Sequence, residues 1–337
     1  MADVWKGEAV FEDGERYPVA IKRVLPELSG NPVYRSMFED EARLGMALRH
    51  PNIVRVYDAR EVGGSYIMIM ELVDGTSLKG LLTAAHERKA GMPVASALFV
   101  AWQLAKALEY AHLATDARGQ SMGIIHRDVS PHNLLLGRNG TVKLADFGLA
   151  DATLHSTQLG DGMLGGKLGY LAPEIIAQEK STPKIDLFAL GIVLWEMLCG
   201  RRLFVGETDV QTVKAVARCD VPPASIHNRA VTADVDAFLS LILEPNTDKR
   251  IATATECAAR LEQLVQRVDA RVGPRDVALL VGLHLASEKH RAPDVPAGVA
   301  ELLAQELALF SSQGSEGALE MPSLGAAPLD PDFFGDR

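Results

Sequence analysis

The chain has 337 residues, of which 47% are hydrophobic and 23% charged, so it can bury one large core or two modest ones. Its formal net charge of −10 argues against a nucleic acid or an anionic membrane surface as its partner, because both require clustered Lys and Arg. The three widely spaced cysteines fit neither a disulfide framework nor a zinc site, and the sequence shows no signal-peptide pattern and no membrane-spanning apolar run, so we expect a soluble cytoplasmic protein.

The first 73 residues predict a small lobe that is rich in strands. The segment "YPVAIKRV" (17–24) is apolar and β-branched around a single lysine, which is typical of a strand. Apolar residues at helical spacing in "YRSMFEDEARLGMAL" (34–48) predict one helix, and "NIVRVYDAR" and "SYIMIMELV" predict two more strands.

From residue 74 to residue 267 long helical patterns dominate. The segment "VASALFVAWQLAKALEYAHLA" (94–114) is apolar around so much of its circumference that it predicts a buried central helix. Short strand-like pieces interrupt the helices and carry most of the polar residues of interest. A small β-rich lobe followed by a larger helical lobe predicts a ligand site between the two.

A change of character after residue 267 indicates a C-terminal helical extension, 268–312, with two amphipathic helices. The second helix has Val299, Leu303, Leu307 and Phe310 on one face. We expect this stripe to pack against the large lobe, because an exposed stripe of that size would favour aggregation. Residues 313–337, rich in Gly, Ser, Pro and acids, predict a disordered tail.

Five polar residues have the chemistry that phosphoryl transfer requires: a phosphate clamp, magnesium ligands and a group that orients the attacking hydroxyl. Lys22 could reach the α- and β-phosphates, and Glu41, on the following helix, could hold that lysine by an ion pair. Asp128 is the candidate for accepting the hydroxyl proton. Asn133 and Asp146 offer hard oxygen ligands suited to magnesium. Each residue alone is a weak signal, because isolated charges are more often solvated or ion-paired.

The order of the motifs makes the signal strong. "VAIK", "DEA", "HRDVSPHN", "DFGLA" and "YLAPE" occur in the order of the protein-kinase signature set. The chain resembles the eukaryotic-like serine/threonine protein kinases of bacteria from Met1 to about Leu264. The resemblance implies an α+β, two-lobed kinase fold with a domain at 1–267, divided into an N-lobe (1–73) and a C-lobe (74–267). It also implies ATP and Mg²⁺ as cofactors and a protein Ser/Thr substrate in signal transduction.

The resemblance further implies a nucleotide site. Met70 would control access behind the adenine, and the backbones of Glu71 and Val73 would pair with the adenine edge. Val4, Ala20 and Leu135 would sandwich the ring. Arg250 resembles the arginine that pairs with the glutamate of "APE", Glu174, and we expect His126 to be a packed histidine rather than an acid or base.

The start of the chain departs from the family pattern. A kinase opens with a strand and a glycine-rich loop, G-x-G-x-x-G-x-V, that covers the phosphates. "MADVW" aligns with only the end of that loop, with Ala2 at the third glycine and Val4 at the valine, so the first strand and two glycines are missing. We expect that the start was assigned at an internal methionine and that the rest of the loop is encoded upstream.

Two further departures concern one lysine. The family usually has a lysine two places after the catalytic aspartate, and Ser130 stands there. It usually has a threonine in the segment before "APE", and Lys167 stands there. The two positions are neighbours in the folded family, so we expect Lys167 to supply the missing cation to the γ-phosphate and Ser130 to supply a hydroxyl near Asp128.

The activation segment, 146–174, carries Thr153, Ser156 and Thr157. Arg127 would leave an unbalanced positive charge beside this segment, and a phosphate could pair with it. We therefore predict autophosphorylation among these three hydroxyls.

Two other functions stay open. A pseudokinase that acts as a nucleotide-binding regulatory module is favoured by the incomplete loop and by Ser130, and disfavoured by the complete set of catalytic and metal-binding residues. A small-molecule kinase of related fold, such as an aminoglycoside phosphotransferase, is disfavoured by the segment from Tyr170 to Glu174, which such enzymes generally lack.

Overall fold

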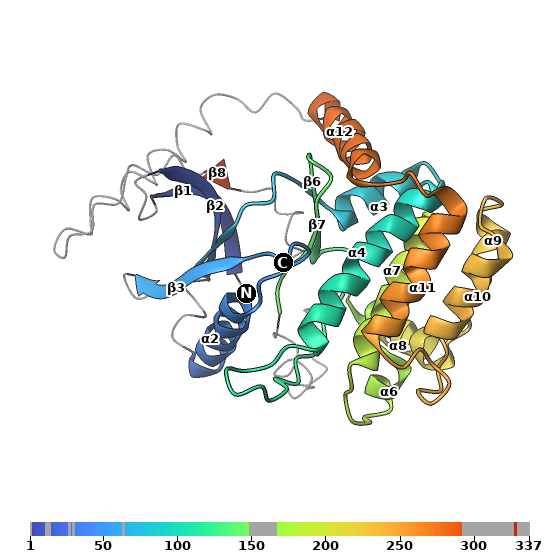
Figure 1. Ribbon diagram of the computed structural model, residues 1–337, viewed down its shortest axis with the longest axis horizontal. Coiled ribbons are helices and arrows are strands. Elements are labelled where there is room, and N and C mark those ends of the chain that lie inside the picture. Colours follow the sequence, from blue (N-terminus) through green and yellow to red (C-terminus); the bar gives the residue numbers. More distant parts are fainter. Residues whose placement is uncertain are drawn as a thin grey trace.

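The computed structural model describes residues 2–10, 15–25, 28, 31–62, 65–147, 167–291 and 327–328. Within these ranges the chain forms two lobes, an antiparallel sheet with one helix and a larger helical body (Figure 1). The predicted two-lobed α+β fold is confirmed. The three hydroxyls of the activation segment and the stripe from Val299 to Phe310 lie outside the described residues.

The small lobe is built on an antiparallel sheet with the strand order β3-β4-β2-β1-β8. Its strands are β1 (Ala2–Val10), β2 (Arg16–Val24), β3 (Val56–Val62), β4 (Ser65–Glu71) and β8 (Ala327–Pro328). Side chains alternate along β2, so Lys22 is buried on the same face as Ala20 and Val24. This alternation points the lysine into the molecule.

Helix α2 (Pro32–Ala47) packs against this sheet. It begins at Asn31, whose side chain accepts a hydrogen bond from the Val33 backbone N–H at 2.9 Å, and Pro32 fits the first turn because no N–H is needed there. The buried face of α2 includes Glu41 and Gly45, one turn apart. A Cβ at residue 45 would collide with the Val56 side chain, so glycine permits the close approach that brings Glu41 to the sheet.

The large lobe is centred on α4 (Val94–His112) and α7 (Lys184–Cys199). All residues of α7 after the first are buried, and the helix ends at Gly200, whose φ of 61° lies in the left-handed region that glycine tolerates. The surrounding helices are α3 (Leu78–Glu87), α6 (Pro173–Ile176), α8 (Asp209–Arg218), α9 (Ala224–His227), α10 (Ala233–Ile242) and α11 (Ala254–Asp269). Helix α11 lies along α4 (Figure 1).

A second, three-stranded antiparallel sheet positions the polar residues between the lobes. It consists of β5 (Gly75–Ser77), β6 (Leu134–Gly137) and β7 (Val142–Leu144). The loop 126–133 runs directly into β6, and Asp146 follows β7. Because β6 and β7 are paired, the end of that loop and Asp146 are brought side by side.

The first helix expected in the C-terminal extension is α12 (Pro274–Arg291), which packs against α3, β5 and β6. Val277 and Val281 are fully buried, whereas Leu279 and Leu283 are mostly exposed. Apolar residues therefore lie on both faces, and the expectation of a simple amphipathic helix was wrong. Two residues of the tail expected to be disordered, Ala327–Pro328, form β8 beside Trp5 and Lys6 of β1.

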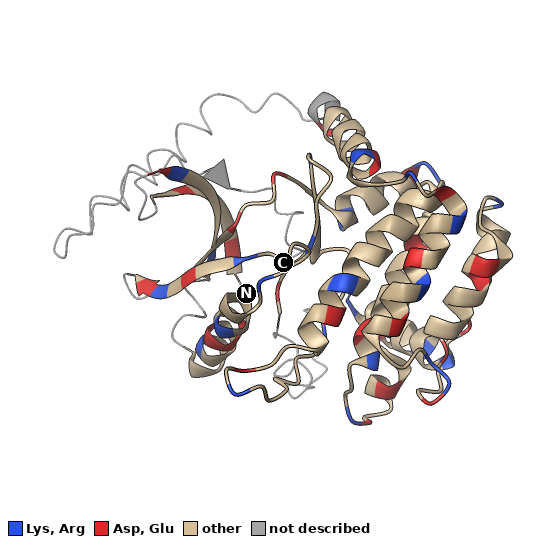
Figure 2. Cartoon of the chain, viewed as in Figure 1, with Lys and Arg blue, Asp and Glu red and all other residues tan. Residues whose placement is uncertain are grey.

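Basic and acidic residues are interspersed along the chain in both lobes (Figure 2). None of the helices in the described ranges has the length and hydropathy needed to cross a bilayer. The cysteines at 199, 219 and 257 are free thiols.

Candidate active site

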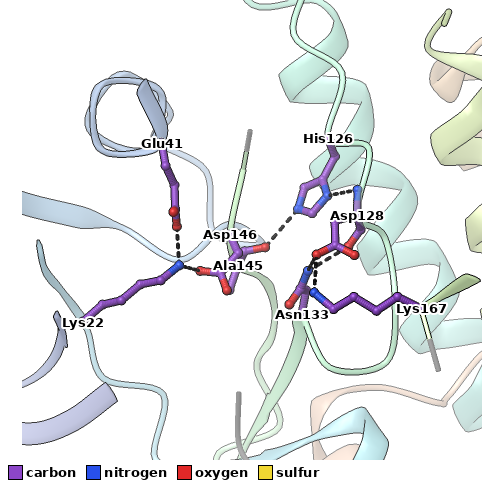
Figure 3. A network of polar contacts seen from close by, with 8 residues as sticks. All are labelled: Lys22, Glu41, His126, Asp128, Asn133, Ala145, Asp146 and Lys167. Atoms are coloured by element: carbon purple, nitrogen blue, oxygen red, sulfur yellow. Dashed lines mark hydrogen bonds and ion pairs between the residues drawn. The ribbon is translucent and has the colours of Figure 1, made fainter. Parts of the chain in front are cut away.

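Three charges from distant parts of the sequence, the buried Lys22 and Glu41 and the partly buried Asp146, form one half of the site (Figure 3). The Lys22 ammonium lies 2.6 Å from Glu41 Oε1 and 2.9 Å from Asp146 Oδ1. Strand β2 supplies the lysine, helix α2 supplies the glutamate, and Asp146 follows β7. The network therefore forms only when α2 is docked on the sheet and the segment after β7 turns inward.

The electrostatics of this network are set by one ammonium shared between two carboxylates. Burial acts to lower the pKa of Lys22, but Asp146 and Glu41 outweigh it and hold that pKa above its ordinary value. Burial acts to raise the pKa of Glu41, and the attraction of Lys22 acts to lower it. Burial also opposes ionisation of Asp146, yet Lys22 keeps the pKa of Asp146 below its ordinary value. Lys22 is thus a cation suited to phosphate, and Asp146 an ionised ligand suited to a divalent metal.

Asp186 of α7 holds the loop that carries Asp128. The Asp186 carboxylate accepts hydrogen bonds from the backbone N–H groups of His126 and Arg127, each at 2.8 Å. His112 Nε2 lies 2.8 Å from the same carboxylate. Arg127 has a φ of 66°, a conformation that costs a non-glycine residue about 1–3 kcal/mol. The two backbone hydrogen bonds that Asp186 accepts stabilise this turn and so fix the direction of Asp128.

His126 is a packed residue of the scaffold, as expected. Its side chain is fully buried, and its Nε2 lies 2.9 Å from the Ala145 carbonyl oxygen. Its ring lies 4.5 Å from the Phe147 ring at 66°, an edge-to-face contact. Asp146 lies between Ala145 and Phe147 in the chain and has a φ of 61°. The flanking contacts hold this left-handed residue in place.

Asp128 and Asn133 form the other half of the site (Figure 3). Asn133 Nδ2 donates to the Asp128 carbonyl oxygen at 2.8 Å and to Asp128 Oδ2 at 2.9 Å. The Asn133 amide oxygen points away from Asp128 in the close view. Asn133 also contacts the segment that carries Asp146, because its carbonyl oxygen accepts a hydrogen bond from the Ala145 N–H at 2.8 Å.

The lysine expected near Asp128 lies there. Lys167 Nζ donates to Asp128 Oδ2 at 2.8 Å, and the Lys167 side chain is 43% exposed. Ser130 is buried, and among the described residues its Oγ has no hydrogen-bond partner. The structure therefore brings Lys167 to the aspartate, while no hydrogen bond joins Ser130 to either residue within the described ranges.

The residues expected around the adenine are gathered in the small-lobe core. That single buried cluster contains Val4, Ala20, Met70, Val73 and Leu135. Glu71, which was also expected at the adenine, makes polar contacts instead.

The Glu71 N–H donates to the Arg55 carbonyl oxygen at 2.8 Å, and its carboxylate lies 2.9 Å from Lys143 Nζ. Strand pairing sets Ala20 opposite Met70 and Val4 opposite Lys22. The apolar group expected to hold the base is therefore continuous with the lysine expected to hold the phosphates.

The donor set fits a magnesium nucleotide. Within the described part of the chain, no group of three or more His, Cys, Asp or Glu side chains is arranged to hold a metal ion. Magnesium in nucleotide sites keeps waters and phosphate oxygens and needs only one or two protein oxygens. The Asp146 carboxylate and the Asn133 amide would supply two such oxygens, and Lys22 would supply a matching charge for the phosphates.

Several residues that support the site were missed from the sequence. Asp186 holds the loop, His112 contacts the Asp186 carboxylate, and Glu196 accepts a hydrogen bond from the Tyr170 hydroxyl at 2.7 Å. The available signal was a pair of acids, Asp186 and Glu196, within the otherwise apolar helix α7. A buried acid in such a helix requires a polar partner. The predicted pair of Arg250 with Glu174 is present at 2.7 Å.

Comparison with known proteins agrees with this geometry. The sequence matches the protein kinase domain family over residues 8–261. Tyrosine-protein kinase MasK of Myxococcus xanthus is 32% identical over 289 residues, which cover 86% of this chain and 45% of that protein. Serine/threonine-protein kinase PrkC of Bacillus subtilis is 32% identical over 265 residues, 78% of this chain and 38% of that protein.

Serine/threonine-protein kinase PknB of Mycobacterium leprae is 32% identical over 248 residues, 72% of this chain and 38% of that protein. The chain thus spans less than half the length of these curated relatives. The family match covers Lys22, Asp128 and Asp146, whose arrangement is described above. The chain belongs to the protein kinase domain family.

Proposed function

We propose that this chain is an ATP-dependent serine/threonine protein kinase that acts in bacterial signalling. The observation that carries the proposal is the ion pair of Lys22 with Glu41 at 2.6 Å, formed together with the contact of Lys22 to Asp146. This network joins Lys22 and Glu41 of the small lobe to Asp146, one of the two proposed magnesium ligands. Asp128, the candidate base, is held separately by Asn133.

The residues divide the work of the reaction. Lys22, kept charged by its two carboxylates, binds and orients the α- and β-phosphates. Asn133 and Asp146 would hold Mg²⁺, which neutralises charge on the phosphates when bound. Asp128 orients the acceptor hydroxyl and takes its proton. Most of the catalysis then comes from position and charge.

The acceptor is a protein side chain, and we favour serine and threonine. PrkC and PknB are named serine/threonine kinases at 32% identity. Tyrosine is the second candidate, because MasK, matched over 86% of this chain, is named a tyrosine-protein kinase. We also propose a cytoplasmic location, where ATP is available and the free thiols at 199, 219 and 257 remain reduced.

The test uses the purified chain, Mg²⁺ and γ-labelled ATP with three peptides that differ only in a central Ser, Thr or Tyr. We expect label on the Ser and Thr peptides and none with Asp128→Asn or Asp146→Asn. Label on the Tyr peptide alone would favour the second candidate. Nucleotide binding by thermal shift without transfer to any acceptor or to the chain itself would favour a pseudokinase.

A further inference from the structure

We propose that Lys167 is a catalytic residue that brings the cation for the transferred γ-phosphoryl group from the activation segment rather than from the catalytic loop. This inference rests on the proposed function and concerns the same site. The juxtaposition that carries it is the Lys167 ammonium 2.8 Å from Asp128 Oδ2.

The position of this ammonium matches the place where charge develops. Asp128 Oδ2 accepts from both Lys167 Nζ and Asn133 Nδ2, at 2.8 and 2.9 Å. When Asp128 accepts a proton from the acceptor hydroxyl, that hydroxyl oxygen lies within hydrogen-bond distance of the carboxylate. In the reaction, the same oxygen forms the new bond to the γ-phosphorus. An ammonium on Asp128 is therefore one short movement away from the phosphoryl oxygens, and the flexible lysine stem permits the movement.

The catalytic loop offers no cation two places after Asp128. Ser130 stands there, 1% exposed, and its Oγ has no hydrogen-bond partner among the described residues. A buried hydroxyl without a partner costs about 1–3 kcal/mol, so packing alone would favour alanine. A buried serine at this position is consistent with a polar role that is fulfilled when nucleotide and acceptor are bound.

The backbone of Lys167 is anchored while its side chain stays accessible. The Tyr170 N–H donates to the Lys167 carbonyl oxygen at 3.0 Å, and the Tyr170 hydroxyl donates to Glu196 Oε2 of α7 at 2.7 Å. A Cβ on Gly169 would lie 2.5 Å from the Phe204 carbonyl oxygen, so this short turn is packed tightly on the large lobe. Lys167 is thus positioned by a docked segment. A cation delivered in this way is present only when the segment is docked, which couples the chemistry to the state of that segment.

The proposed step is balanced without any further reactant. The acceptor oxygen forms a bond to the γ-phosphorus as the bond from that phosphorus to the β,γ-bridging oxygen breaks, and ADP leaves with the electron pair. The hydroxyl proton passes to Asp128. Lys167 keeps its protons and stabilises the charge spread over the phosphoryl oxygens.

The test compares the wild-type chain with Lys167→Ala, Lys167→Arg, Ser130→Lys and the double variant Ser130→Lys/Lys167→Thr, with Lys214→Ala on the exposed face of α8 as the control. We expect Lys167→Ala to lower kcat about a hundredfold. We expect its KM for ATP and its Kd for MgADP to stay within about threefold, because the interaction is made chiefly in the transition state. The double variant should have a kcat at least about tenfold higher than that of Lys167→Ala, since it restores one ammonium in the same space. Lys214→Ala should match the wild type.

A second measurement does not depend on the acceptor. MgADP with aluminium fluoride mimics the phosphoryl group during its transfer. We expect this complex to bind the wild type more tightly than MgADP alone does. In Lys167→Ala we expect the two to bind equally tightly. The proposal is overturned if Lys167→Ala keeps both kcat and the aluminium fluoride advantage. It is also overturned if Lys167→Ala is faster than the wild type, since Lys167 would then block Asp128. A wild type that binds nucleotide but transfers phosphate to no acceptor, water included, and shows no such advantage would instead contradict the proposed function.

Discussion

Arg250 donates two parallel hydrogen bonds to Glu174 inside the large lobe, from Nη1 to Oε1 at 2.7 Å and from Nη2 to Oε2 at 2.9 Å. The Arg250 side chain is 0% exposed and that of Glu174 4%. The guanidinium also stacks 4.7 Å from the Phe188 ring centroid. The pair joins the end of the segment that carries Lys167 to the loop before α11.

Arg250→Met tests this pair. The change leaves the Glu174 carboxylate buried without its cation, and we expect a loss of about 3–5 kcal/mol in the free energy of unfolding, measured with urea. The matched control is Arg260→Ala, which removes an exposed pair with Glu256 at 2.9 Å and should cost less than about 1 kcal/mol. Equal losses in the two variants would show that burial gives the Arg250 pair no special weight.

The elements that hold the candidate catalytic residues could be predicted because their patterns are local. Alternation along β2 set Lys22 inward, and helical spacing set Glu41 on the buried face of α2. The role of Asp186 could not be predicted in the same way. Its partners include the backbone N–H groups of His126 and Arg127, which leave no trace in a side-chain pattern.

The C-terminal extension shows a second limit of the sequence. Val277, Leu279, Val281 and Leu283 are all apolar, and two of them face the large lobe while two face solvent. The sequence pattern cannot rank two apolar faces of one helix, because the choice depends on the tertiary surface that is offered. Lys167 could be placed beside Asp128 only because the chain resembles a family in which the two loops meet. Residue spacing alone carries no such information.

Lys22→Met tests the phosphate clamp. We expect transfer from ATP to fall at least about a hundredfold, because the phosphates lose a preorganised cation, and the affinity for MgATP to fall as well. Lys106→Met is the control. It removes a lysine that stacks 4.4 Å from the Trp102 ring centroid on α4, away from the site, and should leave turnover within about twofold of the wild type. Full activity of a folded Lys22→Met protein would contradict the assignment.

The docking of α12 is tested by one pair of substitutions on the same helix. Val281→Asp places a carboxylate at a fully buried position against the large lobe, whereas Leu279→Asp alters a side chain that is 62% exposed. We expect Val281→Asp to lower the free energy of unfolding by at least about 3 kcal/mol, or to detach α12, and Leu279→Asp to change it by less than about 0.5 kcal/mol. Limited proteolysis near residue 273 would report detachment. Resistance of both variants to proteolysis, with equal stability, would mean that α12 contributes nothing to the large lobe.

The pair of Tyr170 and Glu196 predicts a pH dependence of stability. Burial raises the pKa of Glu196 above its ordinary value of 4.5, although Arg202 and the Tyr170 hydroxyl act in the opposite direction. A carboxyl group with a raised pKa binds its proton more tightly in the folded than in the unfolded chain. Its contribution to stability is therefore largest at low pH and declines as the pH rises from the ordinary value through the raised one.

Glu196→Gln removes this titration while keeping an oxygen that accepts from Tyr170. We expect the difference in free energy of unfolding, wild type minus Glu196→Gln, to fall in urea titrations as the pH rises from the ordinary value of 4.5 through the raised pKa of Glu196. Tyr170→Phe removes a hydrogen bond that lowers the pKa of Glu196, so its stability should fall more steeply over the same range, after an initial loss of about 1–3 kcal/mol. If the curves of the wild type and Glu196→Gln run parallel across this range, the buried carboxyl is not the titrating group, and the anchor beneath Lys167 does not respond to pH.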